Sequence, residues 1–274
     1  MSTIVISERE FASLRDSIRD RLGIYYDDTK LFLLQSRLQT RLIKNRCESF
    51  AAYHRFLAAS LQRDKEWDEL ASVLSNNETY FFRERAQLEV LASEAVDEAL
   101  RSSGRLRIWS SGCSTGEEPY TIAMVLLDSK RLNPSAVTIR ASDISPAALE
   151  RAKAGFYREL AFRATAPEMV RRHFTPFESG FVVSDEVKRM VVFFRMNLVE
   201  TAAFAGFGVH DAIFCRNVLI YFDKPTQKRV VEAFAGSLRP GGFLFLGHAE
   251  SIARLTDLYE PFVTSKAIYY RRRP

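Results

Sequence analysis

The chain has little cysteine and little histidine. Its 274 residues include three cysteines (Cys47, Cys113 and Cys215) and four histidines. The cysteines form no CxxC pair and have no histidine at the spacing of a metal site, so the sequence holds no readable zinc motif. An odd number of widely spaced cysteines also argues against a disulfide framework. We therefore expect a protein from a reducing compartment, without a bound metal.

Long apolar runs and a strong charge of one sign are also missing. No run is long enough to cross a bilayer, and the start, MSTIVISERE, lacks the basic lead and apolar centre of a signal peptide. The formal net charge is +5, from 39 basic and 34 acidic residues that are mixed along the chain. This balance is too mild to indicate nucleic-acid binding. We expect a cytoplasmic globular protein that is not embedded in a membrane.

The first 76 residues have the pattern of an all-helical domain. Ser7 and Glu10 form a capping box, apolar residues then recur on one helix face, and the first helix should end near Gly23. A second helix has an apolar stripe of leucines from Leu31 to Leu42. Basic residues gather on an adjoining face of this second helix: Lys30, Arg37, Arg41 and Lys44. A basic helix face is most often just solvated surface, and the pattern alone favours that interpretation.

From Arg105 onward, strand-like and helix-like segments alternate, as in a doubly wound α/β sheet. The polar stretch SNNETYFFRE separates this part from the helices, and we expect residues 77–83 to be a linker and residues 84–274 a second domain. The pieces GFVVS and RMVVFFRM, flanked by Pro176 and Gly180, predict a small antiparallel β insertion at about 175–196. The final segment, FVTSKAIYYRR, should pair antiparallel with the sheet, since no crossover helix precedes it.

The run IWSSGCSTGEEPY, Ile108 to Tyr120, predicts a strand that turns through glycines into a helix. Gly112 and Gly116 would let the backbone pass close to a ligand, and such a turn is typical of a nucleotide cradle. Glu117 and Glu118 at the helix start would repel a pyrophosphate, so a cationic nucleoside fits better. Asp143 ends the next strand, where an acidic side chain accepts hydrogen bonds from ribose hydroxyls. S-adenosylmethionine meets both requirements.

Five motifs then occur in the order seen in the chemotaxis receptor methyltransferases, the CheR family. They are NETYFFRE, SSGCSTGEEPY, ASDIS, FCRNVLIYFDK and LRPGGFLFLGHAES. The chain resembles this family over nearly its whole length. The resemblance implies a Rossmann-like methyltransferase that transfers the methyl group of S-adenosylmethionine to glutamates on the cytoplasmic helical bundle of chemoreceptors. The products would be glutamyl methyl esters and S-adenosylhomocysteine, and receptor contact would fall in the helical domain, at the basic face of the second helix.

The resemblance also assigns site residues. Tyr221 matches the aromatic residue near the transferred methyl group. Glu118 is preferred to Glu117 as the acid that faces the cofactor, although spacing cannot decide between them, and the other acid should face solvent. The remaining cofactor contacts implied by the family motifs are Asn77, Thr79, Arg83, Asp143, Asn197, Leu198, Arg216 and Asn217.

Three other functions remain open from the residues, the third being a methyltransferase that acts on nucleic acid, which the weak charge bias and the absence of an NPPY-like motif disfavour. GCSTG fits the GxSxG nucleophile elbow of serine hydrolases, with Ser114, Asp211 and His248 in the chain order of that fold. However, the chain begins with helices instead of strands and has no HGGG-like oxyanion loop. A module that binds S-adenosylmethionine without catalysis is the second alternative, and the intact motifs argue against it.

Some family members carry a glycine-rich loop in the β insertion, which is associated with capture of a pentapeptide at the receptor's C-terminus. The corresponding stretch here, HFTPFESGFVVSDEVKRMVVFF, contains only Gly180. Glycines permit the tight turns with positive φ that such a loop needs. We therefore expect an enzyme that is not tethered by a receptor pentapeptide.

Overall fold

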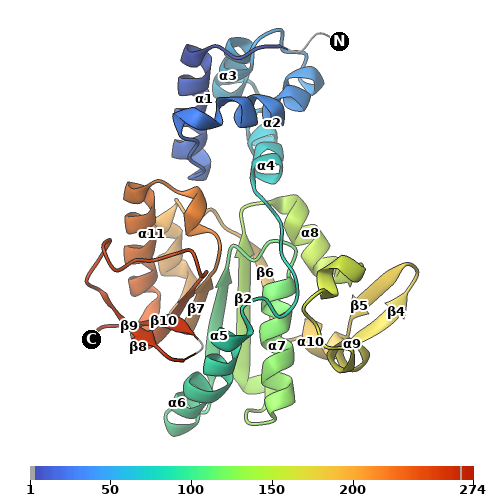
Figure 1. The fold of residues 1–274 in the computed structure, drawn as a ribbon, viewed down its shortest axis with the longest axis vertical. Helices are drawn as coiled ribbons and strands as arrows, with labels where there is room; N and C mark the ends of the chain where they lie inside the picture. Colours follow the sequence, from blue (N-terminus) through green and yellow to red (C-terminus); the bar gives the residue numbers. More distant parts are fainter. Residues whose placement is uncertain (1–3, 266) are drawn as a thin grey trace.

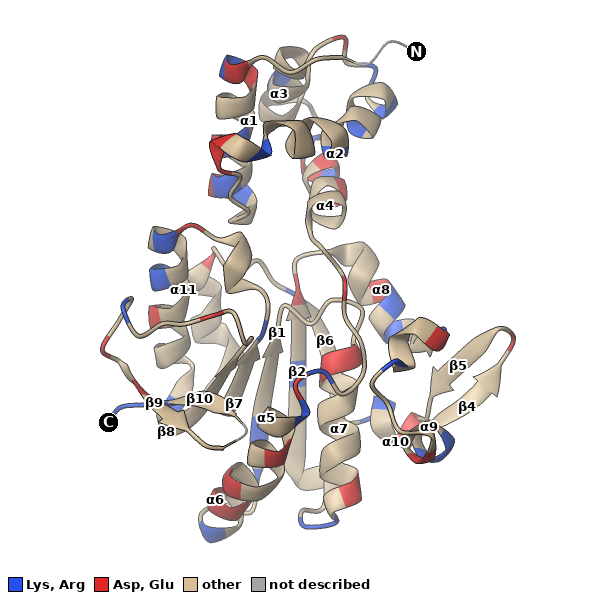
Figure 2. Ribbon diagram, in the orientation of Figure 1, with Lys and Arg blue, Asp and Glu red and all other residues tan. Residues whose placement is uncertain are grey.

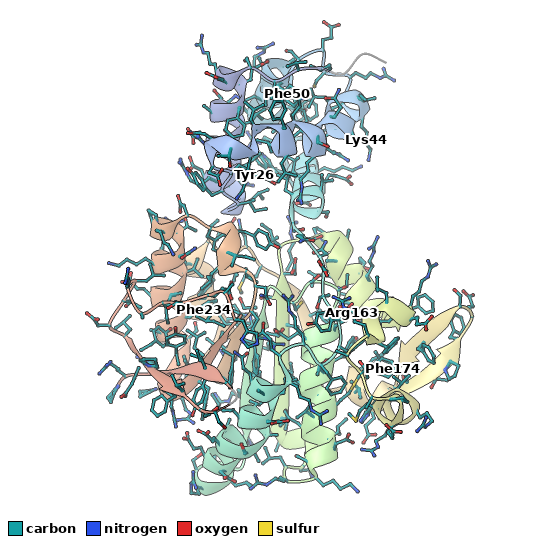
Figure 3. All side chains as sticks on the ribbon, in the orientation of Figure 1. Tyr26, Lys44, Phe50, Arg163, Phe174 and Phe234 are labelled. Atoms are coloured by element: carbon teal, nitrogen blue, oxygen red, sulfur yellow. The ribbon has the colours of Figure 1, made fainter. Side chains whose placement is uncertain are left out.

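The computed structural model describes residues 4–265 and 267–274, so the first three residues of the expected helical domain lie outside it. A helical bundle stands on a larger α/β part (Figure 1). The bundle contains α1 (Glu8–Leu22), the short η1 (Asp28–Lys30), α2 (Leu31–Lys44), α3 (Phe50–Ala59) and α4 (Arg63–Leu74). The predicted capping box at Ser7 is confirmed, and Gly23 ends α1 in the left-handed region, at φ 78°. Apolar side chains of these helices, including Phe50, fill the bundle interior (Figure 3).

Arg41 corrects one expectation from the sequence. It is only 6% exposed, and its Nε and Nη2 donate to Glu66 at 2.9 and 2.6 Å. The prediction that Arg41 shares an exposed basic face is therefore wrong, because its guanidinium holds α2 against α4. Hydrogen bonds from Arg41 and Tyr53 outweigh the effect of burial, which alone would raise the pKa of Glu66, and they hold that pKa below its ordinary value.

The larger part is a seven-stranded sheet with helices on both faces, which confirms the predicted α/β class. Its strands are β1 (Leu106–Ser111), β2 (Val137–Asp143), β6 (Val191–Arg195), β7 (His210–Cys215), β8 (Leu238–Leu246), β9 (Tyr259–Val263) and β10 (Ile268–Arg272). Their order is β6-β2-β1-β7-β8-β10-β9. Neighbouring strands from β6 through β2, β1 and β7 to β8 pair in parallel. β10 pairs antiparallel with β8, as expected for the final segment.

Alternate residues of the central strands pack against different helices, as the strand period of two requires. Ile108 and Phe214 belong to one core with α7 (Glu117–Ser129). Their neighbours Trp109 and Ile213 belong to a second core with α11 (Lys224–Gly236). The first core also receives α5 (Arg85–Val90), the π-helical η2 (Leu91–Ala95) and α6 (Val96–Arg101).

The β insertion differs from the prediction at both ends. The antiparallel three-stranded sheet has the order β3-β5-β4, from β3 (Phe156–Tyr157), β4 (Phe174–Phe177) and β5 (Gly180–Val183). The segment RMVVFFRM is not part of it, because β6 pairs parallel with β2 at the edge of the main sheet. The expected bounds of 175–196 are therefore wrong at both ends, because they omit β3 and include β6.

Short helices complete the fold. They are η3 (Pro134–Ala136), α8 (Pro146–Ala154), η4 (Glu159–Phe162), α9 (Pro167–His173), α10 (Asp185–Lys188), η5 (Thr201–Phe207) and η6 (Leu219–Tyr221). Basic and acidic residues are interspersed over both parts (Figure 2). Within the described ranges, no helix has the length and apolarity needed to span a membrane.

Candidate functional site

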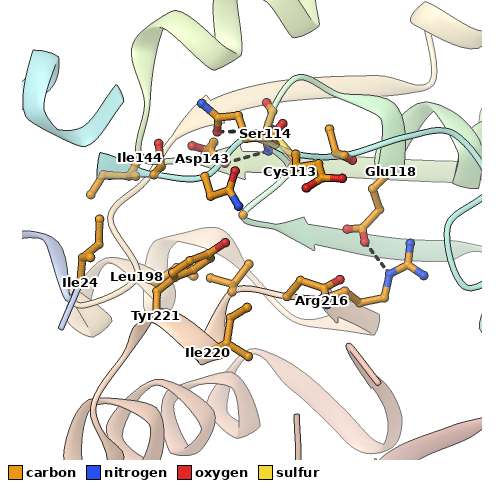
Figure 4. A pocket seen from close by; sticks show the side chains of 18 of the residues that line it. Ile24, Cys113, Ser114, Glu118, Asp143, Ile144, Leu198, Arg216, Ile220 and Tyr221 are labelled. Carbon is orange, nitrogen blue, oxygen red and sulfur yellow. Dashed lines mark hydrogen bonds and ion pairs between the residues drawn. The ribbon is translucent and has the colours of Figure 1, made fainter. Parts of the chain in front are cut away.

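A pocket of about 280 Å³ lies at the carboxyl ends of β1, β2 and β7, where open α/β sheets bind ligands. The end of α1, the linker after α4 and the loops after these strands supply its walls (Figure 4). Every cofactor or catalytic residue predicted from the sequence lines this one pocket: Asn77, Thr79, Arg83, Glu118, Asp143, Asn197, Leu198, Arg216, Asn217 and Tyr221. Residues spread over 145 positions of the chain therefore converge on one cavity.

The glycine turn forms one wall of the pocket. Gly112 has φ 73°, and a Cβ there would lie 2.5 Å from Val218 Cγ2, a neighbouring pocket residue. Gly116, at φ 97°, makes room for Ala152 and Tyr157 and is outside the pocket lining. The expectation that both glycines admit a ligand is therefore wrong for Gly116, whose role is packing.

Asp143 is 7% exposed and accepts two backbone hydrogen bonds. Its Oδ2 accepts from Ser114 N at 2.7 Å, and its Oδ1 accepts from Ser145 N at 2.9 Å. Burial raises the pKa of Asp143, and these backbone donors act in the opposite direction. A carboxylate has about four acceptor positions, so the side chain can accept further bonds from a ligand.

The two glutamates at the start of α7 point to different places. Glu118 lines the pocket, and its Oε2 accepts from Arg216 Nε at 2.6 Å. Glu117 is 5% exposed and accepts from Thr115 Oγ1 at 2.7 Å. Burial raises the pKa of Glu117. The structure thus selects Glu118 as the pocket acid, and the expectation that Glu117 faces solvent is wrong.

Two pocket residues also hold the helical bundle in place. Asn197 Nδ2 donates to Arg21 O at 2.8 Å, and Tyr221 O accepts from Tyr25 N at 2.8 Å. Gly23, at the end of α1, approaches Val199 and Phe222 so closely that a Cβ would lie within 3 Å of both. The pocket is therefore built at the junction of the bundle and the sheet.

The linker lines the pocket and is held in place by contacts with the glycine turn and with Arg163. Asn77 Oδ1 lies 3.3 Å from Ser114 Oγ, in the glycine turn. Arg163 stacks on the Tyr80 ring at 3.9 Å and donates to Glu78 Oε1 at 3.1 Å. These contacts fix the backbone that presents Thr79 and Arg83 to the cavity.

Glu250 is a residue that sequence reasoning missed. Its Oε2 accepts from Gly247 N at 2.7 Å and from Asn217 N at 2.9 Å, and its Oε1 accepts from Ile220 N at 3.2 Å. One carboxylate thus ties the loop after β8 to the loop that carries Asn217 and Tyr221. Glu250 lies in the GHAES motif, from which the sequence hypothesis used only the exposed His248.

The serine-hydrolase alternative is contradicted by the positions of its three residues. Ser114 follows the carboxyl end of β1, whereas Asp211 lies at the amino end of the neighbouring parallel strand β7, so the two residues are at opposite ends of the strands. Asp211 there accepts from Arg239 Nε at 2.9 Å. A nucleophile and an orienting acid at opposite ends of the strands cannot share one histidine.

The residues expected at the receptor-contact face are not equivalent. The side chains of Lys30 and Lys44 are 47% and 63% exposed, next to Asp27 and Glu69. Arg37 is half-buried and donates to Leu74 O at 2.6 Å, and Arg41 is buried as described above. The outward face of α2 also carries Phe32, 77% exposed, so its exposed surface is partly apolar.

No group of three or more His, Cys, Asp or Glu side chains that could hold a metal ion occurs in the described part of the chain.

Two family models match the chain. The model described as "CheR methyltransferase, SAM binding domain" matches residues 77–268, and "CheR methyltransferase, all-alpha domain" matches residues 9–75. The first match covers the sheet and the linker, and the second covers the helical bundle.

Curated relatives extend over almost the same length. Chemotaxis protein methyltransferase 2 of Vibrio cholerae is 36% identical over 263 residues, covering 94% of this chain and 91% of the relative. The chemotaxis protein methyltransferase of Escherichia coli is 37% identical over 256 residues, covering 92% and 87%. Among solved structures, magnesium protoporphyrin IX methyltransferase from Synechocystis is 13% identical, with 80% and 94% coverage and a TM-score of 0.39.

Proposed function

Because this chain belongs to the CheR methyltransferase family, we propose that it transfers the methyl group of S-adenosylmethionine to glutamate side chains on the cytoplasmic helical bundle of chemoreceptors. The products are glutamyl methyl esters and S-adenosylhomocysteine, and the reaction takes place in the cytoplasm. The observation that carries this proposal is one pocket that is lined by every predicted cofactor residue together with Tyr221.

The pocket suits S-adenosylmethionine chemically. Asp143 has acceptor positions left for ribose hydroxyls, and Glu118 offers a carboxylate to an ammonium group. Arg83 lines the same cavity and can pair with the methionine carboxylate. Asn217 Oδ1 is buried without a hydrogen-bond partner in the described chain, and such an atom favours a donor from a ligand.

S-adenosylmethionine supplies a methyl group on a positively charged sulfur. The acceptor glutamate has an ordinary pKa near ~4.3, so it is already ionised at neutral pH and needs no general base. As the bond from its oxygen to the methyl carbon forms, the carbon–sulfur bond breaks, and the two opposite charges disappear. A dry site favours this step, and orientation of the reactants can contribute on the order of 7–11 kcal/mol. We assign to Tyr221 the orientation of the acceptor oxygen through its hydroxyl, without proton transfer.

We propose that the receptor docks on the helical domain, with Lys30, Lys44 and the outer part of Arg37 at the contact. Receptor bundles with modifiable glutamates present acidic surfaces, which complement these bases. Arg41 has no direct part in this proposal, because its charge is used inside the bundle.

The β insertion supports independence from a receptor pentapeptide. β4 and β5 are joined by only Glu178 and Ser179, and Glu178 adopts φ 46°. This tight hairpin leaves no long loop to close over a peptide. We expect no binding of a receptor C-terminal pentapeptide in titration calorimetry, together with normal methylation of a receptor that lacks its tail. Micromolar binding of the pentapeptide would refute this prediction.

Glu250→Gln is expected to weaken S-adenosylmethionine binding about tenfold. The amide would present a donor where the carboxylate now accepts backbone N–H groups, and an unpaired buried group costs about 1–3 kcal/mol. Titration calorimetry measures the affinity, with Glu260→Gln on the exposed edge strand β9 as control. Equal affinities of a folded Glu250→Gln variant and the wild type would show that Glu250 does not support the binding site.

The proposed function is tested by calorimetry with S-adenosylmethionine, followed by transfer of labelled methyl to a receptor cytoplasmic fragment. A receptor fragment whose modifiable glutamates are replaced by alanine is the matched control. We expect binding and label only on the glutamate-containing fragment. Binding without transfer would favour the non-catalytic module, and absence of binding would reject both.

A further inference from the structure

Three ionisable side chains form a buried cluster beside the pocket. Arg216 Nε donates to Glu118 Oε2 at 2.6 Å, and Arg216 Nη1 lies 3.8 Å from Glu84 Oε2. The exposed fractions of these side chains are 2% for Arg216, 13% for Glu118 and 7% for Glu84. Two carboxylates therefore share the Arg216 guanidinium, and a second guanidinium, that of the 30% exposed Arg83, has its Nε 4.0 Å from Glu84 Oε1.

Glu84 is the member of this cluster without a complete set of partners. Its Oε2 is buried and has no hydrogen-bond partner in the described chain, while its Oε1 lies 3.4 Å from His248 N. It also has a left-handed backbone, at φ 53°, two residues after Phe82 at φ 61°. Non-glycine residues at positive φ are strained, and they persist where the surroundings require them. A costly conformation thus places a second carboxylate beside Arg216.

The charges explain what the second carboxylate can do. Glu118 is one of the acids that line the pocket, and it is also the closest partner of Arg216. A cation bound at Glu118 would compete with Arg216 for the same carboxylate. Arg216 is too buried for water to compensate its charge, and its other hydrogen bond is donated to the carbonyl oxygen of Arg83, at 2.8 Å. Glu84 needs a shift of only about 1 Å to reach charge-assisted hydrogen-bond distance.

We propose that Glu84 is a positioning residue that takes over the charge of Arg216 when Glu118 binds the ammonium group of S-adenosylmethionine. This inference rests on the proposed function. Glu84 does not line the pocket and acts through Arg216. In the free protein Glu118 already satisfies Arg216, so Glu84 adds little to stability there.

This role predicts a separation between stability and binding. In Glu84→Gln, the thermal unfolding temperature of the free protein should be unchanged or higher, because Glu118 already neutralises Arg216 and a second buried carboxylate with an unsatisfied oxygen is removed. The affinities for S-adenosylmethionine and S-adenosylhomocysteine should both fall about tenfold, since both ligands carry the ammonium group. The affinity for 5′-methylthioadenosine, which has the nucleoside but no ammonium, should stay the same.

The experiment is titration calorimetry with these three ligands on the wild type, Glu84→Gln and the exposed control Glu260→Gln, beside thermal unfolding without ligand. Unchanged affinity for S-adenosylmethionine would overturn the inference. Equal weakening for 5′-methylthioadenosine, or a lower unfolding temperature with unchanged affinities, would instead indicate a structural role and would also overturn it.

Should Glu84→Gln not fold, Glu84→Asp provides the test. This substitution keeps the charge but moves it away from Arg216. It should therefore lower the affinity for the two ligands that carry an ammonium group and leave the affinity for 5′-methylthioadenosine unchanged. Failure of the wild type to bind S-adenosylmethionine would reject the proposed function, whereas wild-type binding with unaltered variants would reject only the role of Glu84.

Discussion

Replacing Arg41 by methionine is expected to lower the free energy of unfolding by about 3–5 kcal/mol, the usual cost of breaking a buried ion pair on one side. The substitution leaves the carboxylate of Glu66, which is 4% exposed, without its cation between α2 and α4. Urea unfolding followed by circular dichroism measures the loss. Lys44→Ala is the matched control, because Lys44 is exposed on the same helix, and it should cost less than about 1 kcal/mol.

The same pair predicts a pH dependence. The folded protein holds the pKa of Glu66 below its ordinary value of 4.5, so the ion pair stabilises fully above that value. Its contribution is lost as the pH falls through the lowered pKa. The stability difference between wild type and Arg41→Met should therefore be complete at pH 7 and shrink below about pH 4. A difference that is small at neutral pH would show that Arg41 is surface charge after all.

Asp143→Ala is expected to weaken S-adenosylmethionine binding by about 1–3 kcal/mol, which is a loss of roughly fivefold to a hundredfold in affinity. The alanine removes the expected partner of the ribose and also the acceptor for Ser114 N and Ser145 N. The glycine turn and the start of α8 would then lose a shared anchor.

Titration calorimetry on a variant with wild-type circular dichroism measures this effect. Asp257→Ala, in an exposed loop outside the pocket lining, should bind normally. Wild-type affinity in Asp143→Ala would remove Asp143 from the site.

Local signals predicted most of the fold. Ser7 with Glu10 gave the start of α1, Gly23 gave its end, and the alternation after Arg105 gave the parallel sheet. The prediction that RMVVFFRM belongs to the β insertion is wrong, because a β-branched and aromatic run indicates a strand but not its partner. Parallel pairing with β2 depends on contacts with residues about 50 positions earlier.

The pocket residues could be predicted because each lies in a short motif at the end of a strand or in the linker. The sequence did not reveal the directions in which side chains point or the residues with which they pair. Adjacent acids at a helix start point about 100° apart, so the orientation of α7 decides that Glu118 enters the pocket and Glu117 does not. Arg41 has the spacing of a surface base, and only the packing of α4 reveals its partner Glu66.

This chain is expected to form methyl esters on receptor glutamates. The most direct measurement incubates the protein with methyl-labelled S-adenosylmethionine and a receptor cytoplasmic fragment, and then treats the labelled fragment with alkali. Carboxyl methyl esters hydrolyse in alkali and release volatile methanol, whereas N-methyl groups are stable. We predict that the label is incorporated and then released as methanol. Label that survives alkali, or no incorporation into any glutamate-bearing receptor fragment, would show that the chain does not form methyl esters on receptor glutamates.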